Sequence, residues 1–130
     1  MEFIKSEIEG LVLIKPKVFF DNRGYFFESY NSIHFKNAGI DVNFVQDNQS
    51  KSGKNVIRGL HFQKPPYSQG KLVRVIKGAV MDVAVDIRAN SPSYGKWEMH
   101  LLTEENHTMF YIPEGFAHGY YTISDTAEVL

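Results

Sequence analysis

Short apolar runs, each bounded by turn residues, divide the chain into predicted strands. The runs are rich in valine, isoleucine, phenylalanine and tyrosine, which favour strands over helices. The predicted strands are Leu11–Lys15, Tyr25–Tyr30, Asn43–Asn48, Val56–Phe62, Lys71–Ile76, Ala79–Ile87, Lys96–Leu102, Thr108–Ile112, Gly119–Ile123 and a last one beginning near Ala127. Only Ser32–Asn37, closed by Ala38-Gly39, predicts a helix. This pattern indicates an all-β sandwich, jelly roll or barrel with one short helix.

The strand Ala79–Ile87 alternates in a way that bears on function. Asp82 and Asp86 share one face with Val80 and Ala84, whereas the opposite face is wholly apolar. Two carboxylates among small apolar residues fit a wet barrel interior. They fit an ordinary outer face equally well.

Composition and charge narrow the class of protein. The 130 residues carry 14 Lys and Arg against 15 Asp and Glu, a net charge of −1, and contain no cysteine. Such a length predicts one domain, 1–130, and the charge argues against nucleic-acid or membrane-surface binding. The N-terminus is too charged for a signal peptide, so the sequence predicts a cytoplasmic protein. Absence of cysteine excludes disulfides, thiolate metal sites and cysteine nucleophiles.

The chain ends at Leu130, part-way through a strand-like alternation. Natural domains seldom stop inside a pairing strand, because its neighbour is left with an open edge. We therefore expect the domain to lack a C-terminal segment.

A guanidinium and an imidazole stand three residues apart in the strand Val56–Phe62. Strict alternation sends Arg58 and His61 to opposite faces, but a bulge at Gly59 would turn both inward. The simpler interpretation is an edge strand with a surface arginine and a structural histidine.

The segment Pro113-Glu114-Gly115-Phe116-Ala117-His118-Gly119 resembles the second motif of cupin barrels, whose histidine binds a metal. The first cupin motif supplies His-x-His, but His61-Phe62-Gln63 stands in that place. The sequence therefore predicts a cupin-type jelly-roll barrel without a metal, because two histidines make a poor divalent site.

Two further segments carry candidate binding groups. Lys71 opens a strand on the same face as Val73 and Val75, where it either snorkels at the rim or approaches a buried anion or carbonyl. The segment Asp21–Glu28 offers Arg23, Phe26 and Glu28, an arginine, an aromatic ring and a carboxylate that suit a phosphate and a base. An ordinary turn followed by an aromatic core strand explains the same residues.

Taken together, these segments resemble the dTDP-4-dehydrorhamnose 3,5-epimerase family over essentially the whole chain. The motifs that carry the resemblance are Asp21-x-Arg23-Gly24-x-Phe26-x-Glu28, Phe44-Val45-Gln46-Asp47-Asn48, Arg58-Gly59-Leu60-His61-Phe62-Gln63, Gln69-Gly70-Lys71-Leu72-Val73-Arg74-Val75, Asp82-Val83-Ala84-Val85-Asp86-Ile87-Arg88, Ser91-Pro92-x-x-Gly95-x-Trp97 and Pro113–Gly119. Each motif is weak alone, but seven in register are specific.

The resemblance implies a jelly-roll barrel and a homodimer that exchanges N-terminal strands. It implies metal-free inversion of C3 and C5 of a dTDP-linked 4-keto-6-deoxyhexose, without a cofactor. The product would be dTDP-4-dehydro-L-rhamnose, one step before dTDP-L-rhamnose for cell-surface polysaccharide.

The resemblance also implies roles for individual residues. His61 matches the base that removes the C3 and C5 protons, and Lys71 the cation beside the enolate oxygen. His118 matches a position lining the site, and Asp82, by its place on the strand, could orient an imidazole. The residues that match the substrate-binding set are Arg23 and Arg58 at the pyrophosphate, Phe26 and Glu28 at the nucleotide, and Gln46, Asp47 and Asn48 beside it. In the family, the Arg23 segment serves the partner subunit's site.

The departure from the family pattern is at the C-terminus. The family's proton-donor tyrosine would follow Leu130, and the carboxylate paired with the base comes later still. Tyr120 and Tyr121 do not occupy the donor's position. Three alternatives stay open: a dTDP-sugar-binding barrel without turnover, a metal-dependent cupin such as a dioxygenase, and a relative that epimerises one carbon or shifts the ketone.

Overall fold

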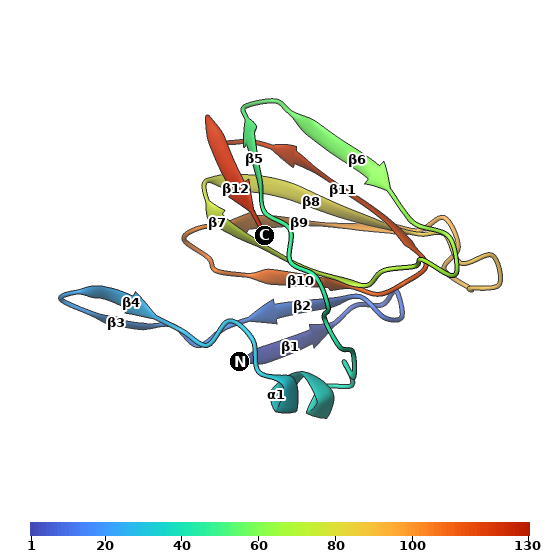
Figure 1. Ribbon diagram of the computed structural model, residues 1–130, viewed down its shortest axis with the longest axis horizontal. Coiled ribbons are helices and arrows are strands. Elements are labelled where there is room, and N and C mark those ends of the chain that lie inside the picture. Colours follow the sequence, from blue (N-terminus) through green and yellow to red (C-terminus); the bar gives the residue numbers. More distant parts are fainter.

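Two packed β-sheets, a short helix and a projecting hairpin make up the computed structural model, which describes residues 1–130 (Figure 1). The elements are β1 (Glu2–Lys5), β2 (Val12–Lys15), β3 (Phe19–Asp21), β4 (Gly24–Phe26), α1 (Ser32–Asn37), β5 (Ser50–Gly53), β6 (Ile57–His61), β7 (Lys71–Lys77), β8 (Ala79–Asp86), β9 (Trp97–Thr103), β10 (Met109–Ile112), β11 (Phe116–Thr122) and β12 (Thr126–Val129). One sheet has the order β1-β2-β10-β7-β12-β5 and the other β6-β11-β8-β9. This arrangement confirms the predicted jelly-roll fold.

The main core lies between the two sheets. Alternate residues of β7, including Val73 and Val75, face alternate residues of β8, including Val80 and Ala84, and all four are buried. A second cluster covers the outer face of the six-stranded sheet, where Phe35 of α1 packs over it. Apolar side chains therefore pack against one face of the smaller sheet and against both faces of the larger sheet.

The predicted helix is confirmed at both of its ends. Asn31 caps the helix, because its side-chain oxygen accepts hydrogen bonds from the amides of Ile33 and His34. The helix is followed by Gly39, whose φ of +92° suits glycine best. At six residues, this helix is far too short to cross a membrane, and the chain has no other.

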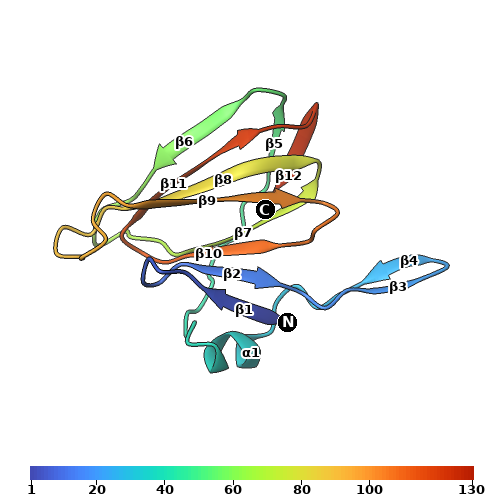
Figure 2. The same ribbon diagram turned by 180° about the vertical axis from the view of Figure 1, so that it is seen from behind.

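Strands β3 and β4 form a hairpin that projects from the body, and we call residues 19–26 the arm (Figures 1 and 2). Phe20 and Phe26 are each 72% exposed, so the arm buries few of its aromatic rings. Its root is held by His107, whose ring lies 4.6 Å from that of Tyr25 and 5.0 Å from that of Phe27.

Two predicted strands need correction. The strand Tyr25–Tyr30 ends at Phe26, where the arm turns back to the body, and Asn43–Asn48 forms no strand. No neighbouring strand offers Asn43–Asn48 a ladder, and the Gln46 side chain donates instead to that of Asn48 at 3.0 Å. The sequence also missed β1, β3 and β5, which are short and largely polar or exposed.

Candidate active site

Polar side chains gather on the inner face of the smaller sheet. Asp82 and Asp86 of β8 share this face with buried Val80 and Ala84, so of the two interpretations of their alternation the interior one is confirmed. On the neighbouring strand β11, His118 lies opposite Ala84, and Tyr120 opposite Asp82. Directly opposed residues of antiparallel strands share a face, so His118 and Tyr120 also point inward.

Strand β6 adds Arg58 and His61 to the same face through a bulge. His61 lies opposite His118 and Arg58 opposite Tyr120, so three steps along β6 span two steps along β11. The extra residue falls next to Gly59, whose φ is +104°. A Cβ atom there would lie 2.6 Å from the His118 carbonyl oxygen, which only glycine avoids. The predicted bulge is confirmed, and it places Arg58 and His61 on one face.

His118 and Asp82 form a hydrogen-bonded pair in the interior. The His118 Nε2 atom lies 2.8 Å from one Asp82 oxygen and 3.0 Å from the other. The Asp82 side chain is 0% exposed and that of His118 is 12% exposed. Burial raises the pKa of Asp82, and the hydrogen bond and charge of His118 oppose that rise.

Lys71 approaches this pair from the opposite sheet. It begins β7 opposite Ile112 and points inward with Val73 and Val75, whose side chains are buried. Burial lowers the pKa of the Lys71 ammonium, and the Asp82 carboxylate partly opposes that shift. Lys71 is therefore a half-buried lysine on the inner face, near the Asp82 carboxylate.

His61 stands at the open edge of the sheet. Strand β6 is the edge strand, and every one of its five residues is exposed. The His61 ring makes no hydrogen bond within the chain, whereas His118, directly opposite, is fixed by Asp82. The two imidazoles are thus neighbours with different restraints: His118 is held by a carboxylate, and His61 has no hydrogen-bond partner within the chain.

Arg58 lies on the same edge strand as His61, and hydrogen bonds hold its guanidinium in place. Its Nε atom donates to Ser52 Oγ at 2.8 Å, and its Nη2 atom donates to the Lys51 carbonyl at 3.0 Å. The Tyr120 hydroxyl lies 3.1 Å from the same Ser52 oxygen.

The remaining predicted binding residues lie outside this cluster. Arg23 and Phe26 are on the arm, where Asp21 pairs with Arg23 at 2.6 Å. Glu28 follows the arm and contacts Asn31 and His34 at the start of α1. Gln46, Asp47 and Asn48 are exposed in the irregular segment that leads from α1 to β5 (Figure 1). The structure thus brings together Arg58, His61, Lys71, Asp82 and His118, and within one chain it leaves the arm residues apart from them.

Proteins of similar sequence include dTDP-4-dehydrorhamnose 3,5-epimerases. The model of the dTDP-4-dehydrorhamnose 3,5-epimerase family matches residues 5–130. The chain belongs to this family. The Escherichia coli dTDP-4-dehydrorhamnose 3,5-epimerase is 54% identical over 129 residues, which cover 98% of this chain and 70% of that protein.

Solved structures of epimerases agree with this assignment. The dTDP-6-deoxy-D-glucose-3,5-epimerase of Legionella pneumophila, in complex with dTDP-4-keto-L-rhamnose, has a TM-score of 0.94 and 47% identity over 98% of this chain and 68% of its own. The Bacillus anthracis dTDP-4-dehydrorhamnose 3,5-epimerase, with TDP and PPi bound, has a TM-score of 0.95 and 42% identity over 98% and 74%. This epimerase-family chain therefore spans about 70% of the length of its relatives.

Several polar residues of the epimerase-family interior escaped prediction from the sequence. Tyr120 shares a face with His118, which a strand beginning at Phe116 would have revealed. His100, within the predicted strand Lys96–Leu102, lies opposite Asp82 and pairs with Glu98 at 3.1 Å. Ser52 belongs to β5, a segment that resembles a turn in sequence.

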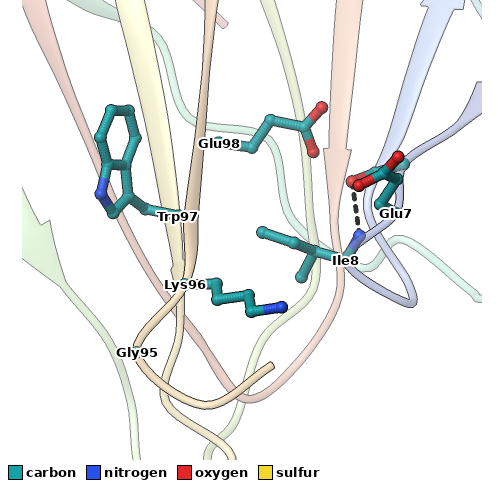
Figure 3. A pocket seen from close by; sticks show the side chains of 7 residues that line it. Glu7, Ile8, Gly95, Lys96, Trp97 and Glu98 are labelled. Carbon is teal, nitrogen blue, oxygen red and sulfur yellow. Dashed lines mark hydrogen bonds between the residues drawn. The ribbon is translucent and has the colours of Figure 1, made fainter. Parts of the chain in front are cut away.

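One surface hollow lies away from the histidines, between the β1–β2 turn and the start of β9 (Figure 3). It is lined by Ser6, Glu7, Ile8, Gly95, Lys96, Trp97 and Glu98. Lys96 extends into it and Trp97 points away. The hollow is open and holds neither imidazole, so the histidine cluster is the better candidate for chemistry. No group of three or more His, Cys, Asp and Glu side chains is arranged to hold a metal ion.

Proposed function

We propose that this chain catalyses the 3,5-epimerisation of dTDP-4-dehydro-6-deoxy-D-glucose to dTDP-4-dehydro-L-rhamnose. The observation that carries the proposal is the placement of His61 opposite the His118–Asp82 pair, with Lys71 facing them from the other sheet. A free base, a restrained imidazole and a half-buried cation are what stepwise proton removal beside a ketone requires.

His61 is the base in this proposal. The C4 ketone acidifies the C–H bonds at C3 and C5, and the unrestrained His61 ring accepts one of these protons from one face of the sugar. Inversion is completed when an acid on the opposite face, a role that the family gives to a tyrosine, returns a proton to the same carbon. His61 passes its proton to solvent before it acts at the second carbon. Removal of either proton places negative charge on O4. Lys71, half-buried and close to Asp82, is the cation that stabilises this charge.

His118 and Asp82 form a positioning pair. The Asp82 carboxylate accepts a hydrogen bond from the His118 ring at Nε2, which fixes the orientation of the imidazole. His118 therefore lines the site as a restrained polar residue beside the unrestrained base, His61.

Binding of the nucleotide end uses residues from two subunits. Arg58 contacts the pyrophosphate from within the chain. The arm supplies Arg23 and Phe26 to the site of the partner in a homodimer, and the exposure of its phenylalanines supports this exchange. Glu28, Gln46, Asp47 and Asn48 complete the nucleotide end. The expected cytoplasmic location stays a prediction.

The test is conversion of substrate by the purified chain. Proton NMR distinguishes the product by its ring coupling constants, because inversion at C3 and C5 reverses the orientation of both hydrogens. The proposal predicts the L-configured 4-keto sugar. Inversion at C3 alone would identify a single-carbon epimerase, and dTDP binding without conversion would identify a non-catalytic dTDP-sugar-binding barrel.

A further inference from the structure

A cluster of three hydroxyl groups lies behind Arg58. The Tyr120 oxygen lies 2.9 Å from Ser50 Oγ and 3.1 Å from Ser52 Oγ, and Ser52 Oγ in turn accepts from the Arg58 Nε atom at 2.8 Å. Ser52 is 5% exposed and Tyr120 is 6% exposed, so water competes little for these bonds. Ser50 and Ser52 belong to the six-stranded sheet, whereas Tyr120 and Arg58 belong to the other. The cluster therefore connects the two sheets by hydrogen bonds beside Arg58.

The directions of these hydrogen bonds follow from the charge. The Arg58 guanidinium can only donate, so Ser52 Oγ accepts from it and its own proton is free for Tyr120. Tyr120 can then donate to Ser50. A chain of hydrogen bonds that begins at a permanent cation is polarised along its length, which strengthens each bond.

The anchored edge of Arg58 determines which edge remains for a ligand. The Nε and Nη2 atoms share one edge of the guanidinium, and Ser52 Oγ and the Lys51 carbonyl occupy it. The Nη1 atom has no partner within the chain, so the end of the guanidinium formed by Nη1 and Nη2 is directed outward. This end can donate two parallel hydrogen bonds to a phosphate.

We infer that Ser52 and Tyr120 are positioning residues that hold Arg58 with its terminal donors directed at the pyrophosphate of the substrate. Without them, the Arg58 side chain keeps its charge but loses its direction, and the affinity for the phosphates falls. This inference rests on the proposed function, because it takes Arg58 as a pyrophosphate contact.

The experiment compares dTDP with thymidine, which lacks both phosphates, as ligands of the parent chain and of five variants. Loss of the hydrogen bond to Arg58 in Ser52→Ala is expected to raise the Kd for dTDP roughly 3- to 10-fold, and Tyr120→Phe to raise it roughly 2- to 5-fold. Neither variant changes the Kd for thymidine, and both raise KM while kcat is unchanged. Ser124→Ala is the matched control, since this half-buried serine is also hydrogen-bonded, in its case to the backbone, and lies away from Arg58. Its affinity for dTDP stays at the parent value.

A fourth variant, Arg58→Lys, separates positioning from general damage. Lysine has no Nε donor to place on Ser52, so Ser52→Ala in the Arg58→Lys background has no further effect on the Kd for dTDP. Equal weakening of dTDP and thymidine by Ser52→Ala, or an additive effect in the Arg58→Lys background, overturns the positioning role. So does an unchanged Kd for dTDP in both Ser52→Ala and Tyr120→Phe.

Failure of the proposed function looks different. A parent chain that does not bind dTDP, or that binds it equally well after Arg58→Lys, removes Arg58 from the nucleotide site and overturns the inference with it. The hydrogen bond itself is read separately from the Arg58 Nε–H resonance, whose exchange with water must accelerate in Ser52→Ala.

Discussion

The Nε2 atom of His118 lies 2.8 Å from a carboxylate oxygen of Asp82 that is completely excluded from solvent. This relationship separates the two histidines that oppose each other on β6 and β11. His118 is restrained by a buried anion, whereas His61 has no partner within the chain. In the proposed function, His61 is accordingly the base, and His118 lines the site.

The Asp82 carboxylate also affects the pH at which Lys71 loses its proton. Burial lowers the pKa of Lys71 below its ordinary value of 10.5, and Asp82 opposes this shift. Since a lysine with a lowered pKa loses its proton at lower pH, the alkaline limb of kcat/KM falls below that value. Asp82→Asn removes the opposing charge and moves the limb to still lower pH. Lys71→Arg, which stays protonated, abolishes the limb, and an identical limb in the parent and Asp82→Asn would disprove the coupling.

Gly59 allows the bulge that turns Arg58 and His61 to the same face. In Gly59→Ala, the new Cβ meets the His118 carbonyl at 2.6 Å while φ stays at +104°. We expect a loss of at least about 2 kcal/mol in the free energy of unfolding, since clash and backbone strain add. The control is Gly53→Ala, where a Cβ has open space. Equal thermal midpoints for the two variants would show that the bulge tolerates a side chain.

Asp86 stabilises the end of the sandwich. Its buried carboxylate accepts from Arg88, Ser91 and Ser93 at 2.6–2.9 Å. Asp86→Asn breaks this network. We expect it to lower the free energy of unfolding by about 3 kcal/mol or more at pH 7, as for other buried pairs. Asp125→Asn, in an exposed pair with Lys54, is the control and leaves the thermal midpoint unchanged.

The same network makes stability depend on pH. The Arg88 hydrogen bond lowers the pKa of Asp86 below its ordinary value of 3.8. A carboxylate with a lowered pKa contributes stability above the ordinary value and loses it as the pH falls below that value. Denaturation curves between pH 7 and pH 2 should therefore show a smaller acid loss for Asp86→Asn than for the parent. An unchanged acid loss would mean that other carboxylates dominate.

Exchange of the arm between subunits is testable by complementation. His61→Ala and Arg23→Ala chains are each inactive as homodimers in this account. When they are mixed and allowed to exchange subunits, one of the two sites in each heterodimer regains both native residues, so about a quarter of parental activity returns, as two-fold symmetry requires. No recovery, with heterodimers demonstrated, would place Arg23 and His61 in the site of the same chain.

The aromatic arm supplies a second test of the dimer. Phe20→Ser removes an exposed ring of the arm and is expected to shift the sedimentation coefficient toward the monomer. Tyr67→Ser removes a ring of similar exposure, 74% against 72%, outside the arm and serves as the control. Equal sedimentation of both variants and the parent would exclude the arm from the interface.

Much of the fold could be predicted because strand periodicity and turn residues are local signals. The helix at Ser32–Asn37 was predicted together with the Ala38-Gly39 pair that closes it. Alternation on β8 predicted that Asp82 and Asp86 share a face, but left open whether that face points inward. The partner of the Asp82 carboxylate could not be predicted, because it depends on the register between β8 and β11. Tyr120 was missed for a narrower reason: with the strand start placed at Gly119, its alternation with His118 was hidden.

The segment Asn43–Asn48 shows a case in which a local strand signal gave a wrong prediction. Its sequence is extended and partly apolar, but a strand requires a neighbour, and no ladder is available on that side of the body. The arm residues Arg23 and Phe26 show another limit, because in the proposed function they serve the site of a second chain, which one chain alone does not reveal.

Deuterium entry into the substrate tests the central claim most directly. The chain and its His61→Ala variant are incubated with dTDP-4-dehydro-6-deoxy-D-glucose in D2O, and NMR follows the signals at C3 and C5. We predict that the parent exchanges both protons, while His61→Ala exchanges neither and binds dTDP within a few-fold of the parent, because the base contacts the sugar and not the nucleotide. Exchange that persists in His61→Ala, or no exchange in the parent, would contradict the assignment of His61 as the base of a 3,5-epimerase.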